Sequence, residues 1–389
     1  MHRTISGRGR SARRPRLIAV AGTSGKTTTT WLTAAVLAEA GLQVGVLSDL
    51  GCLGPDDASP VIDDYASARG LAGWLERLAD AGCSHAVVEV TPRMLARRTL
   101  ATAACDTVVV TNLPAGRDRR GQAARVRAAD LATRLVPGGC LVSGCDAGST
   151  ALLRARLPAG VDSVSAGLAA DCDVRATPVE GTLFGRTVLA SWCGQVVPLS
   201  LDTPVVPFVR DSLLAIAVGG RYGVPLEVAV RGVESAGGVP GRVERIDRGQ
   251  DAALFVDSPT SPHALAATLA SLRRLTRGRL VVIAEDPLVA RLGGGSFGPL
   301  VARHCDACVV APTSVLTEDP AESDVAAYAR IDRLLDSLTA GDCGLVLGGS
   351  DGQGGPVGGP PGRFPLATLV DAWLQIAGAP AEARRRPAA

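Results

Sequence analysis

A glycine-rich segment near the start of the chain constrains the fold more than any other feature. Residues 22–27 (GTSGKT) directly follow the apolar run 16–21 (RLIAVA), and the pattern of 28–40 predicts a helix that ends at Gly41. In such a strand–loop–helix unit, backbone N–H groups and the helix N-terminus point at phosphate oxygens. Val20 stands where the longer form of the motif has a glycine, so the loop is of a short form. The segment predicts an ATP-binding phosphate loop.

The distribution of lysine supports this interpretation. Lysine and arginine together number 40, yet Lys26 is the single lysine of the chain. A compact ammonium fits a tight phosphate loop better than the wide guanidinium of arginine does. We therefore expect Lys26 to neutralise phosphate charge and the Thr27 hydroxyl to bind Mg²⁺. The residues expected to contact ATP in this segment are Gly22, Thr23, Ser24, Gly25, Lys26, Thr27 and Thr28.

Alternating strands and helices predict the architecture around the loop. The expected strands span 16–21, 43–48, 85–90, 107–112 and 140–143, and the expected helices span 66–81, 210–222 and 225–235. Continuous apolar strands are typical of a parallel sheet that is covered on both faces. Short strands between 173 and 201, including 181–190 and 195–201, are expected to be antiparallel at the sheet edge. The order predicts an α/β domain with a mostly parallel, doubly wound sheet.

A second, smaller α/β unit is expected after residues 239–244 (VPGRVE), which we interpret as the domain junction. Its strands are expected at 252–257, 280–284, 307–311 and 344–348, and its first helix at 262–275. These boundaries predict a central ATP-binding domain at 16–240 and a Rossmann-like C-terminal domain at 241–380. The basic segment 1–15 and residues 381–389 are expected to be disordered tails. An export signal at Arg13–Arg14 is not expected, because the apolar stretch behind it leads into the phosphate loop.

Composition argues against several classes of partner. The net charge of +2 favours neither nucleic acid nor a membrane surface. No apolar run approaches the ~18–20 residues that cross a bilayer. Cys305 and Cys308, beside His304, resemble half of a zinc site, but no second pair of ligands is evident. We therefore expect a cytoplasmic protein with reduced cysteines and without a nucleic-acid or membrane partner.

Polar residues end two of the expected strands near the loop. Glu89 stands at the end of 85–90, and Asn112 at the end of 107–112. The carboxyl ends of strands in an open parallel sheet face the ligand crevice. A carboxylate at this position can hold Mg²⁺ against a triphosphate, whereas a strand-end salt bridge is the structural alternative for Glu89.

Five segments occur together in an order that is typical of one enzyme family. They read AGTSGKTT (21–28), VVEVTPRMLA (87–96), VVVTNL (108–113), VPGRVER (239–245) and VDSPTSPHAL (256–265). From about residue 16 to 375 the chain resembles the Mur ligase family. Within that family it is most similar to the branch that adds the third residue to UDP-N-acetylmuramoyl-dipeptide in cell-wall synthesis. The resemblance covers the family's central ATPase domain and its C-terminal domain.

The resemblance implies an ATP- and Mg²⁺-dependent ligase that joins a carboxylate to an amine. In the family, ATP phosphorylates the carboxylate and the amine then displaces phosphate from the acyl phosphate. A cell-wall precursor and an amino acid would be the substrates. By position, Asn112, Arg242 and Asp257 would line the nucleotide site, while Thr27 and Glu89 would hold magnesium. Closure of the C-terminal domain over ATP would then belong to the reaction cycle.

The chain departs from the family pattern at the second magnesium. The family's D-H-L-D segment, which carries a metal-binding histidine, is replaced by residues 113–118 (LPAGRD), and Asp130 stands in place of a carbamylated lysine. We hypothesise that Arg117 takes the place of this metal and pairs with Asp130, and that both act in catalysis with Lys26 and Glu89. Two unrelated surface substitutions are the alternative. The family's UDP-sugar-binding N-terminal domain is not found, so a protein partner is expected to take over its role.

Three functions follow from these observations. The first is an active Mur-type ligase, which the residues Lys26, Thr27 and Glu89 favour. The second is an ATP-binding pseudoenzyme or regulatory relative, which the missing histidine and lysine favour. The third is a plain P-loop ATPase or kinase, which accounts for neither the segment 239–245 nor the second α/β unit.

Overall fold

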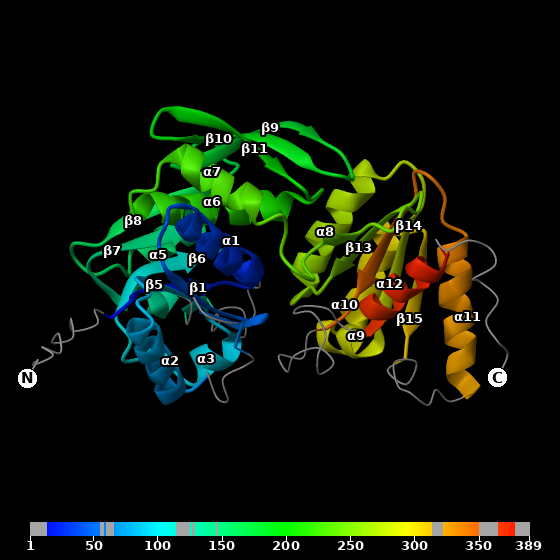
Figure 1. The fold of residues 1–389 in the computed structure, drawn as a ribbon, viewed down its shortest axis with the longest axis horizontal. Coiled ribbons are helices and arrows are strands. Elements are labelled where there is room, and N and C mark those ends of the chain that lie inside the picture. Colours follow the sequence, from blue (N-terminus) through cyan, green and yellow to red (C-terminus); the bar gives the residue numbers. More distant parts are fainter. Residues whose placement is uncertain are drawn as a thin grey trace, which may run out of the picture.

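The structure is a computed structural model, and it describes residues 14–54, 58–59, 66–113, 125–126, 129–144, 147–312, 322–349 and 365–377. Two α/β units lie side by side along the long axis of the molecule, each built on its own sheet (Figure 1). The unit with the phosphate loop carries the larger sheet. The predicted fold class, a mostly parallel α/β unit followed by a smaller α/β unit, is confirmed.

The first sheet is mainly parallel at its centre. Its strands are β1 (Arg16–Ala21), β2 (Val44–Ser48), β3 (Gly51–Leu53), β4 (Ala58–Ser59), β5 (His85–Glu89), β6 (Cys105–Val110), β7 (Leu135–Ser143), β8 (Asp162–Gly167), β9 (Val174–Gly181), β10 (Arg186–Trp192) and β11 (Gln195–Leu201). They lie in the order β11-β10-β9-β8-β7-β6-β1-β5-β2-β3-β4. β1 is parallel to β5 on one side and to β6 on the other, with Val20 opposite Glu89. This register sets the phosphate loop beside the end of β5.

Strands β9, β10 and β11 form an antiparallel meander at the sheet edge, as the pattern predicts. The expected single strand at 181–190 is wrong. A tight turn interrupts it, in which the Thr182 N–H donates to the Gly185 carbonyl at 2.8 Å. A Cβ atom on Gly185 would lie 2.9 Å from the Leu201 carbonyl oxygen, so the close approach of β11 requires glycine there.

Helices cover both faces of the first sheet. α1 (Lys26–Glu39), α6 (Val206–Arg221) and α7 (Leu226–Ser235) pack on one face, and α2 (Ala68–Asp80), α3 (Pro92–Ala96) and α5 (Ala147–Arg154) on the other. α2 shows why such a helix forms. The Ser67 hydroxyl caps its N-terminus by accepting from the Gly70 N–H. Leu71, Leu75 and Leu78 then recur at helical spacing and are buried against the sheet.

The second unit is a five-stranded sheet between two layers of helices. Its strands are β12 (Glu244–Ile246), β13 (Ala253–Asp257), β14 (Leu280–Glu285), β15 (Ala307–Ala311) and β16 (Cys343–Leu347), in the order β12-β13-β16-β14-β15. Its helices are α8 (Pro262–Leu275), α9 (Asp286–Leu292), α10 (Gly294–His304), α11 (Glu322–Asp336) and α12 (Pro365–Ala377). The short antiparallel strand β12 begins at the end of the segment that we interpreted as the domain junction, where no strand was expected.

The two units share an apolar core. One cluster of buried side chains runs from α6, with Phe208 and Leu213, to α8, with Leu265 and Leu269. The loop after β1 and the start of α1 contact the segments that precede α8 and β12, through the hydrogen bonds from Thr260 Oγ1 to the Thr23 carbonyl and from Arg242 Nη2 to Thr27 Oγ1. Within the described part of the chain, no helix is long and apolar enough to cross a bilayer.

Candidate active site

The phosphate loop joins β1 to α1 in a conformation that depends on its glycines. Gly25 has φ 77°, which is the left-handed region that glycine tolerates best. A Cβ atom on Gly25 would lie 2.3 Å from Asp211 Oδ1, and one on Gly22 would lie 2.0 Å from Thr111 Oγ1. The loop is thus surrounded so closely that side chains at these two positions do not fit.

Residues at the end of β6 hold the loop in place. Asn112 Oδ1 accepts hydrogen bonds from the Thr23 and Ser24 N–H groups at 2.7 and 3.2 Å. Asn112 Nδ2 donates to Ser24 Oγ at 2.6 Å, and Thr111 Oγ1 donates to the Ser24 carbonyl at the same distance. Asn112 therefore lies beside the loop and contacts it directly, and its contact with a nucleotide stays a prediction.

Lys26 and Glu89 form a buried pair at the mouth of the loop. Lys26 Nζ lies 3.8 Å from Glu89 Oε1, and the two side chains are 6% and 0% exposed. Burial raises the pKa of Glu89 above its ordinary value, and the nearby Asp49 carboxylate raises it further. Lys26 and Arg242 oppose this rise of the Glu89 pKa. Lys26, the hydrogen bond from the Asp49 N–H and Arg242 thus favour the charged form of Glu89, against burial and the Asp49 carboxylate.

The residues at this edge fit a magnesium ion. Glu89 Oε1 is buried and has no hydrogen-bond partner among the described residues. An oxygen of this kind is a suitable ligand for a hard divalent cation. The Thr27 hydroxyl lies at the start of α1, where a phosphate-loop hydroxyl meets the metal. A carboxylate and a hydroxyl suited to Mg²⁺ therefore lie at this edge, and their role as its ligands stays a prediction.

The second unit contributes an arginine and an aspartate. Arg242 Nη2 donates to Thr27 Oγ1 at 3.1 Å, and its Nη1 donates to the Ser258 carbonyl at 3.2 Å. Asp257 accepts hydrogen bonds from the Val243 and Ser258 N–H groups at 3.3 and 3.0 Å. Burial raises the pKa of Asp257 to about 6. Arg242 therefore contacts Thr27 across the boundary between the units, and Asp257 lines the same cavity as the loop.

A cavity of about 150 Å³ lies between the loop and the second unit. Its lining includes Lys26, Thr27, Asn112, Arg242, Asp257 and His263. Pockets that bind drug-sized ligands usually measure about 300–1,000 Å³. The volume of this cavity is thus below that range, because the two units lie close together in this structure.

Two acidic residues at this site carry no signal in the sequence. The Asp49 N–H donates to Glu89 Oε2 at 3.1 Å, and Asp49 Oδ2 lies 4.0 Å from Arg242 Nη2. Asp211 lies on α6 with its carboxyl against Gly25, and burial raises its pKa well above the ordinary value. Both come from segments that the local pattern describes only as a strand end and a helix.

Asp130 is not brought to this cluster. Asp130 has a side chain that is 58% exposed and forms an ion pair with Arg156 Nη1 at 2.6 Å. It does not line the cavity beside the phosphate loop. Arg117 lies outside the described residues, so its pairing with Asp130 stays a prediction.

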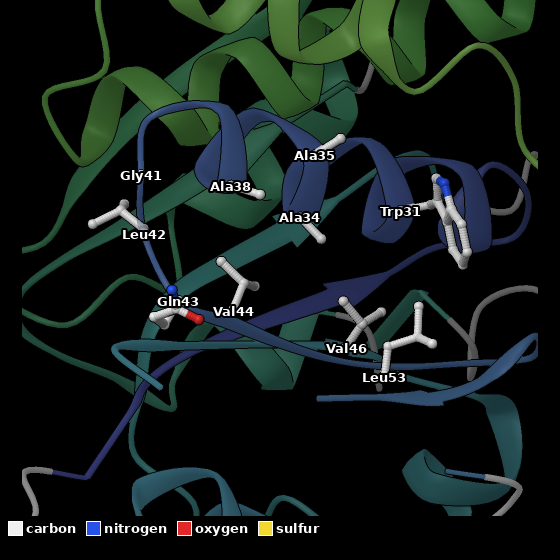
Figure 2. Close-up of a pocket in the computed structure, with 10 residues that line it drawn as sticks. All are labelled: Trp31, Ala34, Ala35, Ala38, Gly41, Leu42, Gln43, Val44, Val46 and Leu53. Carbon is white, nitrogen blue, oxygen red and sulfur yellow. The ribbon is translucent and has the colours of Figure 1, made fainter. Parts of the chain in front are cut away.

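A second cavity, of about 430 Å³, lies between α1 and β2 (Figure 2). Its side chains are apolar apart from Gln43, with Trp31 at one end and Leu42 at the other. No charged side chain lines it. The second cavity therefore lacks the cations that a triphosphate needs.

Comparisons with known proteins identify the family of the unit that carries the phosphate loop. The Mur ligase middle domain matches residues 20–218. The UDP-N-acetylmuramoyl-L-alanyl-D-glutamate–2,6-diaminopimelate ligase of Corynebacterium glutamicum is 33% identical over 316 residues, which cover 78% of this chain and 60% of that protein. The UDP-N-acetylmuramyl-tripeptide synthetase of Roseiflexus sp. is 29% identical, and the match covers 80% of this chain and 65% of that protein.

The fold also matches a solved folylpolyglutamate synthetase from Lactobacillus casei, with a TM-score of 0.64 at 16% identity. That match covers 93% of this chain and 91% of the synthetase. By contrast, the chain spans less than two thirds of the length of the two curated relatives. The family match extends from the end of β1 to α6 and includes the loop, Glu89 and Asn112, and on this ground the chain belongs to the Mur ligase family.

Proposed function

We propose that the protein uses ATP to join a carboxylate to an amine. The observation that carries this proposal is the cluster of Lys26, Thr27 and Glu89 at one sheet edge, with Arg242 and Asp257 reaching it from the second unit. A plain phosphate-loop ATPase needs only the first three. The contribution of the second unit supports a site that is completed by closure of two domains.

The proposed reaction has two steps. A carboxylate oxygen of the substrate attacks the γ-phosphorus of ATP, the bond to the β-phosphate oxygen breaks, and ADP leaves an acyl phosphate. The amine then attacks the acyl carbon, inorganic phosphate leaves with the electron pair of the broken C–O bond, and the amine loses a proton to solvent. Lys26 and Arg242 place positive charge where the transferred phosphoryl group gathers negative charge.

Magnesium, held by Thr27 and Glu89, would supply further positive charge at the phosphates. The residues of the loop bind and orient the triphosphate through backbone N–H groups. Asn112 stabilises the conformation of the loop by accepting hydrogen bonds from two of its N–H groups. Because the cavity is narrow, we infer that the units move apart to admit ATP and close again over it.

The curated relatives support a substrate of peptide character. Their names specify ligases of cell-wall peptide precursors, and we propose a related carboxylate as the acceptor here. The chain aligns with about 60% of such a relative. We therefore propose that a partner protein or a further domain binds the UDP-sugar.

The second candidate is an ATP-binding protein without ligase activity. It is favoured by the sole lysine, because Lys26 in the loop leaves no lysine for a carbamate. In the described part of the chain, no group of three or more His, Cys, Asp or Glu residues is arranged to hold a metal ion. Such a protein would bind ATP and close without turnover.

The decisive experiment measures ADP release with Mg·ATP, with and without a pool of cell-wall precursors and amino acids. A ligase releases ADP only with the pool, and fractionation of the pool then identifies its substrates. Lys26→Ala abolishes release, whereas Arg231→Ala, which removes an exposed surface ion pair with Glu39, leaves it unchanged. ATP binding without stimulated turnover would overturn the ligase proposal in favour of the second candidate.

A further inference from the structure

An additional carboxylate stands in line with the phosphate loop. Asp49 follows β2, and β2 is parallel to β5, with Leu47 opposite Val88. Asp49 and Glu89 therefore lie at the same sheet edge. The order β1-β5-β2 sets the phosphate loop, Glu89 and Asp49 in a row. The hydrogen bond from the Asp49 N–H to Glu89 Oε2 fixes the backbone of Asp49 in this position.

The guanidinium of Arg242 shows that this row accommodates a cation. Arg242 Nη2 lies 3.1 Å from Thr27 Oγ1 and 4.0 Å from Asp49 Oδ2, so it stands between a hydroxyl and a carboxylate. Both are oxygen ligands that magnesium accepts. Nearby, Glu89 Oε1 is buried without a hydrogen-bond partner among the described residues. A positively charged group thus lies between two oxygen ligands, and its charge also acts on Glu89.

Charge balance indicates what happens when a nucleotide enters. In this structure Lys26 and Arg242 face Glu89 and Asp49, so two cations oppose two carboxylates. A triphosphate adds several negative charges beside these carboxylates. At short range and in a partly buried site, an uncompensated carboxylate would weaken binding of the nucleotide. Asp49 is therefore unfavourable at this place unless a further cation binds with ATP.

We propose that Asp49 is a ligand, together with Thr27 and Glu89, of the divalent cation that binds with ATP. In this structure Arg242 lies at the place of this cation, and when ATP binds it turns from Asp49 to the triphosphate. This inference rests on the proposed function, because it requires that the loop binds ATP. It adds to the sequence-based ligand set a carboxylate from a different strand.

The test measures two affinities in Asp49→Asn, which keeps the backbone N–H and the size of the side chain. With a saturating non-hydrolysable ATP analogue, Mn²⁺ binding followed by electron paramagnetic resonance should weaken about 10- to 100-fold. With ATP in EDTA, nucleotide binding should instead tighten at least about twofold, because a negative charge is removed. Asp49→Glu should regain part of the Mn²⁺ affinity. Asp171→Asn, an exposed aspartate on the turn before β9, is the matched control.

The opposite signs separate a ligand from a merely structural residue, since damage to the fold weakens both affinities. Unchanged Mn²⁺ affinity in Asp49→Asn would overturn the inference and leave Asp49 as a resting partner of Arg242. Weakened binding in both assays would also overturn it. If the unsubstituted protein binds no ATP with or without Mn²⁺, the proposed function itself fails, and that outcome is distinct from the other two.

Discussion

Replacing Lys26 with methionine would leave the buried Glu89 carboxylate without the cation that lies 3.8 Å from it. At an effective dielectric constant of about 20, a pair at this distance interacts by about 4 kcal/mol. Removing one partner of a buried pair typically destabilises a protein by about 3–5 kcal/mol. Protonation of Glu89 limits this loss, because a neutral carboxyl needs no partner. The destabilisation of Lys26→Met should therefore depend on pH.

The sign of the pH dependence follows from the direction of the pKa shift. The pKa of Glu89 is raised in the folded protein, and without Lys26 it rises further. An acid of this kind binds its proton more tightly in the folded state, so stability is lost as the pH rises from the unfolded pKa through the folded one. Each pH unit in this window contributes up to about 1.4 kcal/mol. Between the folded-state pKa of Glu89 in the unsubstituted protein and its higher value in Lys26→Met, the deficit of the variant should therefore grow as the pH rises.

Urea unfolding at pH 6 and pH 8, followed by tryptophan fluorescence, measures this difference. The set comprises the unsubstituted protein, Lys26→Met, Glu89→Gln and the double variant. Glu89→Gln in the Lys26→Met background should restore most of the lost stability, because it removes the unpaired charge. A deficit that is equal at both pH values, or that the second substitution leaves unchanged, would refute the proposed energetics of the pair.

Two further predictions concern the loop and the sheet behind it. Gly25→Ala should abolish ATP binding in a calorimetric titration, because its Cβ atom meets Asp211 Oδ1 at 2.3 Å; Gly41→Ala has a similar φ but no atom within 4 Å, and it should keep full affinity. Equal losses in both variants would show that backbone strain, and not the contact, decides. His85 has a pKa lowered to about 4 by burial and by a nearby arginine, so the stability that it permits above pH ~6.5 should decline as the pH falls toward 4. His85→Gln should shift the acid-unfolding midpoint to lower pH, and an unchanged midpoint would contradict this assignment.

Much of the fold follows from local pattern, and the exceptions have identifiable causes. β1 and β15 begin and end where the apolar runs predict. β1 is a buried parallel strand, and such strands are apolar on both faces. β7 begins at Leu135, five residues before the expected strand, and it contains Pro137 and two glycines. These residues favour a turn, but pairing with β6 keeps them in the strand through a shift in register. Pairing with β6, a strand distant in the sequence, thus sets where β7 begins, and the local sequence does not indicate this pairing.

The candidate site shows the same limit more sharply. Glu89, Asn112 and Arg242 belong to recognisable segments, and the structure brings all three to Lys26, Thr23 and Thr27 of the loop. Asp49 follows an ordinary strand, and Asp211 lies inside an ordinary helix. Each becomes part of the site only because β2 lies next to β5, or because α6 packs against α1. Such contacts arise from the order of strands and the packing of helices, which residue spacing along one chain does not specify.

The sole lysine lies at the buried start of α1, and this position gives the molecule a built-in reporter of local unfolding. A lysine-specific protease recognises one peptide bond in the chain, the bond after Lys26, and that bond lies in the first turn of the helix. Proteases act on extended segments, so cleavage requires the loop and the first turn to open. When reclosing is faster than cleavage, the rate of this single cut reports the population of the open form. The protection of one bond would thus measure how strongly each ligand holds the phosphate loop closed.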